Sequence, residues 1–144
     1  MLAAANDTHP MISTVRRLGV LGLPLSIFLV VALAFPWGDL VGHSHWSRVD
    51  WIPFVTRRVR LSDVAANLLL CAPLGSAAGL TFRRGAMAAG ILTLLVSAFV
   101  EWTQVYSHLR FPSMTDIVCN VAGAMAAAAL VNRFARRRLT SRRQ

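Results

Sequence analysis

Residues 85–106 read GAMAAGILTLLVSAFVEWTQVY, an apolar run that follows Arg83 and Arg84 and carries one charged side chain, Glu101, near its end. A helix of about 20 mostly apolar residues is long enough to cross the hydrocarbon core of a bilayer. Three further runs have this length and character, at residues 18–37, 62–82 and 115–133. The sequence therefore predicts an all-α membrane protein with four transmembrane helices.

The composition of the 144 residues supports this class and argues against others. Hydrophobic residues make up 56% of the chain and charged residues only 15%, whereas soluble domains contain about 25% charged residues. The net charge of +9 comes from arginine without any lysine, and the arginines flank apolar runs rather than forming a basic face. We therefore expect no nucleic-acid partner. Two cysteines are too few for a disulfide scaffold.

The arginines also predict the orientation. With the N-terminus inside the cell, ten of the fifteen arginines fall on the cytoplasmic side and five on the outer side, and cytoplasmic loops retain positive charge. We therefore expect both termini to be cytoplasmic (N-in/C-in). The expected organisation is a disordered tail at residues 1–15, a four-span membrane domain at residues 16–135 and a basic cytoplasmic tail at residues 136–144.

The first apolar run has a second interpretation as a signal peptide. Arg16 and Arg17 precede it, and Ala32-Leu33-Ala34 matches an A-x-A cleavage site. The run continues beyond this motif and contains Pro24, which favours a retained span. The sequence leaves the cleavage question open.

Polar residues inside the third run fall on one helix face. Ser97, Glu101 and Gln104 are separated by four and three residues, which places them on a single stripe. A charged side chain at the bilayer centre costs about 2.5–3.5 kcal/mol on insertion scales. We therefore expect this stripe to face other polar stripes or a water-filled cavity.

A short repeat links the second and fourth runs. Residues 62–68 read SDVAANL and residues 115–121 read TDIVCNV, which share the pattern (S/T)-D-(V/I)-x-x-N-(L/V) at a spacing of 53. The acids and amides of the two copies are Asp63, Asn67, Asp116 and Asn120. Each hydroxyl is suited to N-capping, and each acid suits the positive end of a helix dipole. Because both copies would enter the membrane from outside, we expect two helical hairpins related as parallel repeats.

Structural roles are open for the same residues. The two aspartates can stabilise helix starts, and the two asparagines can join neighbouring helices. Glu101 lies within a span and has no neighbouring base in sequence, so its expected partner is Arg110. Arginines of the long outer loop are alternative partners, namely Arg57, Arg58 and Arg60. A structural salt bridge and a functional one are equally compatible with this pattern.

Two other features are expected to be structural or solvated. His43, His45 and His108 share the predicted outer side, but isolated loop histidines are mostly solvated, so we predict no metal and no cofactor. Gly75 and Gly79 form a G-x-x-x-G motif, which is typical of close helix packing in membranes.

Taken in order, the motifs form a longer pattern. They are WIPF at 51–54, D-x-x-x-N at 63–67 leading to PLG at 73–75, S-x-x-x-E-x-x-Q at 97–104, Arg110, Ser113, and D-x-x-x-N-x-x-G at 116–123. This pattern, over roughly residues 50–130, resembles the VanZ-like family of bacterial membrane proteins. The sequence departs from it at Cys71-Ala72, where an aromatic and an aliphatic residue are expected. The resemblance implies a multi-pass protein of the bacterial inner (cytoplasmic) membrane. Its named member is associated with low-level resistance to teicoplanin, a glycopeptide that binds cell-wall precursors.

The polar cluster on the predicted outer face is the candidate ligand-binding site. Its members are Glu101, Gln104, Arg110, Asp116, Asn120, Asp63, Asn67 and Ser97. We expect it to bind a lipid headgroup or a lipid-linked envelope precursor, with Arg110 holding an anionic group. The alternatives are a membrane enzyme with Glu101 or Asp116 as acid/base and a structural helper subunit. Because no known catalytic signature is present, we favour binding over catalysis; the catalytic residues and the oligomeric state stay unknown.

Overall fold

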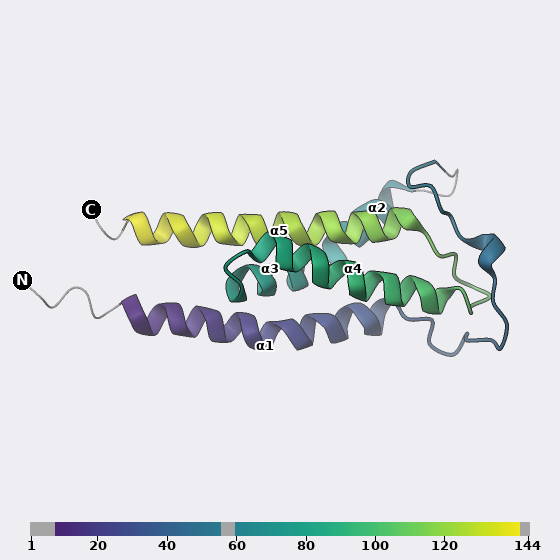
Figure 1. Ribbon diagram of the computed structural model, residues 1–144, viewed down its shortest axis with the longest axis horizontal. Coiled ribbons are helices and arrows are strands. Elements are labelled where there is room, and N and C mark those ends of the chain that lie inside the picture. The colour runs from purple at the N-terminus through teal and green to yellow at the C-terminus, as the bar shows by residue number, and fades with distance from the viewer. Residues whose placement is uncertain (1–7, 56–59, 142–144) are drawn as a thin grey trace, which may run out of the picture.

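The computed structural model describes residues 8–55 and 60–141, in which helices are joined by irregular segments (Figure 1). The helices are α1 (Thr8–Ala34), α2 (Leu61–Leu70), α3 (Ala72–Thr81), α4 (Gly85–Gln104) and α5 (Met114–Ser141), with a short 3-10 helix η1 (Trp46–Arg48) after α1. The described residues contain two isolated β-bridges and no strand. The prediction of an all-α protein is confirmed.

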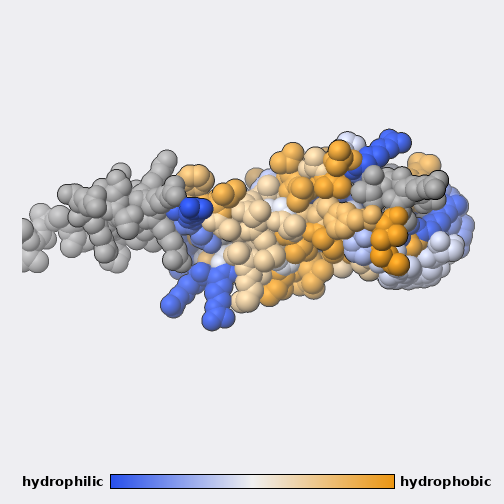
Figure 2. All heavy atoms as spheres, turned by 90° about the horizontal axis from the view of Figure 1, so that it is seen from above, coloured by the Kyte–Doolittle hydropathy of each residue, from blue (hydrophilic) through white to orange (hydrophobic). Residues whose placement is uncertain are grey.

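Four segments are long and apolar enough to cross a membrane. They are Thr14–Ala34, Leu61–Thr81, Gly85–Gln104 and Met114–Ala135, which lie close to the four predicted runs. Figure 2 shows apolar side chains over the middle of the bundle and hydrophilic ones towards both of its ends. This distribution is typical of a multi-pass membrane protein. The N-in/C-in orientation and the parallel repeat stay predictions.

The helices extend into both segments that were expected to be tails. α1 begins at Thr8, so the second half of residues 1–15 is helical rather than disordered. α5 continues to Ser141, through most of the basic segment 136–144. Once a helix has formed, each added residue contributes another backbone hydrogen bond, which favours extension beyond the apolar run. Residues 1–7 and 142–144 lie outside the described residues.

The second span is broken in its middle. α2 ends at Leu70 and α3 begins at Ala72, with Cys71 between them at φ −94° and ψ 0°. Pro73 is the second residue of α3, and a proline lacks the N–H that would bond the carbonyl four residues earlier. Its ring also clashes with that carbonyl, which belongs to Leu69. The break therefore follows from Pro73.

This break sets which helices touch. α3 packs against α1, α4 and α5, whereas α2 packs against α5 and scarcely touches α1 (Figure 1). α1 and α2 therefore diverge towards the end of the bundle that holds residues 35–55 and 105–113. We call this end the loop end.

Glycines allow α5 to approach the second span closely. A Cβ atom on Gly75 would lie 2.0 Å from the carbonyl oxygen of Ala124, and one on Gly123 would lie 2.0 Å from that of Leu68. A Cβ atom on Gly79 would lie 3.0 Å from Ala128. The predicted packing role of Gly75 and Gly79 is confirmed, because no larger residue fits without moving a backbone.

Backbone hydrogen bonds fasten residues 35–55 to the end of α4. Val41 N–H donates to the carbonyl of Tyr106 at 2.8 Å, and His45 N–H donates to that of Val105 at 2.8 Å. The Asp39 carboxylate accepts from the Ser107 hydroxyl and from the N–H of Leu109. The hydroxyl of Ser107, followed by the amide of Leu109, lowers the pKa of Asp39 below its usual value. These bonds give the loop end a fixed shape.

Candidate functional site

A pocket of about 450 Å³ lies at the loop end between α1, α2, α4 and α5. Its polar lining consists of Asp50, Asp63, Asn67, Ser97, Glu101, Gln104, Arg110, Ser113, Asp116 and Asn120. All eight candidate residues from the sequence are among them. The polar stripes of three spans thus converge on one cavity, as expected. That they bind a ligand stays a prediction.

Glu101 is held by a backbone amide. Its carboxylate accepts a hydrogen bond of 2.7 Å from the N–H of Ser113, and its side chain is buried. The hydroxyl of Ser113 in turn accepts from the N–H of Thr115 at 3.1 Å, which caps the first turn of α5. Glu101 therefore ties the end of α4 to the start of α5.

Arg110 is not the hydrogen-bonding partner of Glu101 that the sequence suggested. The two residues share the pocket and lie within electrostatic range. In the described part of the chain, however, the guanidinium of Arg110 forms no hydrogen bond or ion pair, and its side chain is exposed. Of the alternative partners, Arg57 and Arg58 lie outside the described residues, and the exposed Arg60 forms no hydrogen bond or ion pair with Glu101. Arg110 is therefore available to an anionic group in the pocket.

Asn120 carries a buried acceptor without a partner. Its Nδ2 donates to the hydroxyl of Ser97 at 3.0 Å, which joins α5 to α4. Its Oδ1 is buried and accepts no hydrogen bond from the described residues. An unpaired buried polar group costs about 1–3 kcal/mol. Asn120 lines the pocket, but this oxygen has almost no solvent-exposed surface, so a hydroxyl or amine of a ligand reaches it only when the neighbouring side chains move.

Gln104 closes the pocket beside α1. Its side-chain amide donates to the carbonyl of Ala34 at 3.0 Å, which satisfies one of the unpaired carbonyls at the end of α1. Gln104 is buried, whereas Ala34 is half-buried. This bond holds the end of α1 against α4.

The repeated hydroxyls Ser62 and Thr115 do not cap their helices, so that interpretation was wrong. Both helices begin two residues earlier than capping by these hydroxyls requires, which places the hydroxyls inside the first turn. The Ser62 hydroxyl donates to Asp63 at 3.1 Å, and the Thr115 hydroxyl accepts from the N–H of Phe54 at 2.9 Å. The acids are where the repeat placed them, because Asp63 and Asp116 lie in the first turns of α2 and α5.

The two copies of the repeat meet across the pocket. The amide of Asn67 lies within interaction range of the Asp116 carboxyl, and Asp63 lies within electrostatic range of it. Asp63 is exposed, Asn67 and Asp116 are half-buried, and Asn120 is buried. The four residues therefore form a polar path from the surface into the bundle.

Comparison with known proteins gives one match. A family model described as VanZ/LLP1 matches residues 20–135, which is most of the chain. The chain belongs to the VanZ/LLP1 family. This match includes most of α1, which the motif pattern at residues 50–130 did not cover. Comparisons with curated proteins and with solved structures give no match.

The VanZ/LLP1 pocket includes an acid that the sequence argument missed. Asp50 lines it and is fixed by its backbone, which accepts from Met114 N–H at 3.0 Å and donates to the carbonyl of Pro112 at 2.9 Å. Asp50 immediately precedes the WIPF motif, so that motif was the available signal. With Asp50, the lining holds four carboxylic acids and one arginine, which makes the pocket acidic.

Proposed function

We propose that this protein binds the polar headgroup of a membrane lipid, or of a lipid-linked cell-envelope intermediate, in the pocket. The observation that carries the proposal is the mixed character of the lining. Val30, Leu33 and Leu70 form apolar walls on α1 and α2. Most of the polar residues lie on α4, α5 and the segments beside them, with Asp63 and Asn67 on α2, and Val100, Leu109 and Phe111 add apolar surface among them. An amphiphilic ligand matches this division.

The divergence of α1 and α2 supports a lipid rather than a water-soluble ligand. The two helices line the pocket but scarcely touch each other, so the apolar walls lie beside the region that lipid chains occupy. An acyl or prenyl chain in this gap would bury apolar surface against both helices, which contributes about 25 cal/mol per Å². The headgroup would then lie among the polar residues.

The charges of the pocket favour a headgroup that offers both signs or many hydroxyls. Arg110 suits a phosphate or other anionic group. The four acids of the lining accept hydrogen bonds from hydroxyls or amines. A zwitterionic or sugar-bearing headgroup satisfies both requirements, whereas a purely anionic one meets repulsion from the four acids.

The physiological setting is also a proposal. Because the motif pattern implies a bacterial inner-membrane protein, we propose that ligand binding affects the cell envelope and contributes to resistance against teicoplanin-type glycopeptides. Those antibiotics bind cell-wall precursors, and a protein that holds a lipid-linked precursor would change how much of it is accessible.

A second candidate function is catalysis in the same pocket. Its support is that Glu101 and Asp116 both line the pocket, and paired carboxyls can act as general acid and base. The discriminating measurement is a time course with extracted membrane lipid. Catalysis yields a modified lipid whose amount grows with time and is absent with the Glu101→Gln variant, whereas binding alone yields no new species.

Co-purifying lipid tests the binding proposal. The full chain would be extracted in a mild detergent, and bound lipid would be quantified by mass spectrometry. We expect one class of amphiphile at about one molecule per chain, and a reduced amount with the Asp116→Asn variant. Arg84→Gln is the matched control, because Arg84 is an exposed charge in the turn between α3 and α4 and does not line the pocket. The same lipid composition in all three samples would contradict the proposal.

A further inference from the structure

Three histidines gather at the loop end, outside the pocket. The metal-binding atoms of His43, His45 and His108 all lie within 4.8 Å of one another. The ring centroids are 4.7 Å apart for His43 and His45, 5.3 Å apart for His43 and His108, and 4.8 Å apart for His45 and His108. His43 and His108 are exposed, and His45 is half-buried. None of the three lines the pocket, so this cluster is distinct from the proposed ligand site.

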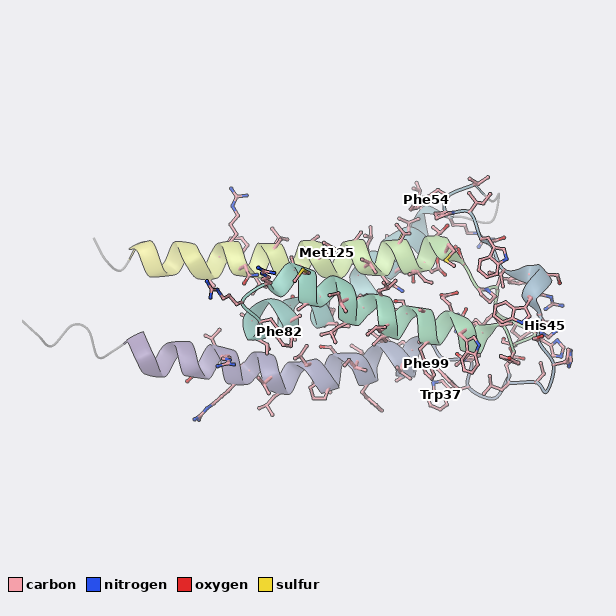
Figure 3. The ribbon with its side chains drawn as sticks, viewed as in Figure 1. Trp37, His45, Phe54, Phe82, Phe99 and Met125 are labelled. Atoms are coloured by element: carbon pink, nitrogen blue, oxygen red, sulfur yellow. The ribbon has the colours of Figure 1, made fainter. Side chains whose placement is uncertain are left out.

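The backbone brings these distant residues together. His108 follows α4, whereas the other two precede η1, and the main-chain bonds of Val41 and His45 hold the two segments side by side. Arg48 adds a side-chain bond of 3.0 Å to the carbonyl of His108. Figure 3 shows His45 at the tip of the loop end. The cluster is therefore built by the fold rather than by a local sequence motif.

One of the three rings, that of His45, has the hydrogen bond that is typical of metal-binding histidines. Nδ1 of His45 lies 3.3 Å from the carbonyl oxygen of Val105, and such a bond fixes the tautomer that leaves Nε2 for a metal. The Asp39 carboxylate is within electrostatic range of His108 and adds negative charge nearby. The guanidinium of Arg48, which bonds the carbonyl of His108, opposes this charge, so the three imidazole nitrogens rather than the local charge are the basis for a metal site.

We propose that His43, His45 and His108 bind one divalent transition-metal ion of the zinc type. Zinc takes imidazole nitrogens at about 2.0–2.1 Å in a tetrahedral arrangement, so two ligand nitrogens on one ion are about 3.3 Å apart. Rotation of the exposed side chains brings the present separations into this range. The bound ion joins residues 35–55 to the end of α4 and leaves a fourth position for water.

Zinc titration of the full chain tests this proposal. The protein would carry an affinity tag without histidine, be purified in detergent and be stripped with a chelator. Isothermal titration calorimetry with Zn²⁺ should then give one site per chain, and Co²⁺ should give the visible absorption of a tetrahedral site. We expect His45→Ala and His108→Ala each to weaken binding at least tenfold. Zinc should also raise the melting temperature of the wild type and not that of either variant.

The fourth histidine provides the matched control. His9 lies in the first turn of α1, at the opposite end of the bundle, so His9→Ala should bind zinc like the wild type. His43→Ala changes an exposed side chain, and it guards against misreading a folding defect in the other variants. Absence of a saturable site in the wild type would overturn the proposal. So would zinc binding that His43→Ala, His45→Ala and His108→Ala leave unchanged, or that His9→Ala weakens equally.

Discussion

Asn120 and Ser97 join α5 to α4 through a hydrogen bond of 3.0 Å, and this bond uses only the donor of the Asn120 side chain. The acceptor, Oδ1, stays buried without a partner in the described residues. The donor of this side chain therefore joins two helices, whereas its acceptor has no partner in the described residues and becomes available to a ligand only when the surrounding side chains move. Substitutions can separate the two.

Asn120→Leu should reduce lipid retention with little effect on stability. Leucine has the same branched arrangement of side-chain heavy atoms, with a larger volume and neither donor nor acceptor, so the bond to Ser97 is lost together with the cost of the unpaired oxygen. These effects oppose each other, and we expect the free energy of unfolding to change by no more than about 1 kcal/mol. Thermal unfolding in detergent and quantitative lipid analysis give the two values.

Thr93→Val is the matched control for that variant. Thr93 on α4 also has a buried oxygen without a partner, but it does not line the pocket. Valine has nearly the same shape, so lipid retention should equal that of the wild type. If Thr93→Val lowered lipid retention as much as Asn120→Leu, the proposal that lipid binds in the pocket would be contradicted.

Asp116→Asn separates a binding role from a helix-start role. The change keeps volume and most hydrogen-bonding capacity but removes the charge. Loss of an acid from the first turn of α5 costs about 0.3–1 kcal/mol, so membrane abundance should stay near the wild-type value. We expect lipid retention and glycopeptide resistance to be lost, as measured in a host without its own copy beside quantitative immunoblotting. Normal resistance at normal abundance would mean that the polar residues of the pocket have only a structural role.

Glu101 and Arg110 should differ in their contributions to stability. Glu101→Leu leaves the N–H of Ser113 without its acceptor, which should cost about 1–3 kcal/mol. Arg110→Gln removes an exposed guanidinium that has no hydrogen bond or ion pair to the described residues, so the melting temperature should hardly change. The double variant should show the sum of the two effects. A double variant much more stable than this sum would mean that the two side chains interact directly.

Some of this site could be predicted from the sequence. Helical periodicity was sufficient to bring Ser97, Glu101 and Gln104 onto one face, and the cost of charge in lipid required that face to meet other polar groups. Asp50 was missed because it lies on an irregular segment, whose position depends on backbone bonds to residues more than 60 positions away. The histidine cluster depends on the same kind of bonds.

The helix boundaries show a second limit of prediction from the sequence. The break at Cys71 can be anticipated from Pro73, but the direction in which α2 then runs depends on its packing against Gly123. The hydroxyls Ser62 and Thr115 looked like caps because helix starts cannot be placed to one residue from sequence. A shift of two residues was enough to give the cap of α5 to Ser113.

The orientation can be tested by reporter fusions. Fusions after Arg84 and after Arg138 should report the cytoplasm, and fusions after Arg48 and after Ser107 should report the outside. The reason is the excess of arginine at the end of the bundle opposite the loop end. A cytoplasmic signal after Arg48 would place the pocket on the inner face and exclude a role on outer-leaflet precursors.

Photo-crosslinking in the intact membrane tests the central claim, lipid binding between α1 and α2, most directly. A benzophenone amino acid would replace Leu70, which lines the pocket, or Leu95, a 64% exposed residue of α4 that does not. Mass spectrometry would then identify the captured lipid. We predict that position 70 captures one class that is scarce at position 95, and that Asp116→Asn abolishes this difference. Capture of the same bulk lipids in the same proportions at both positions, unchanged by Asp116→Asn, would contradict the account.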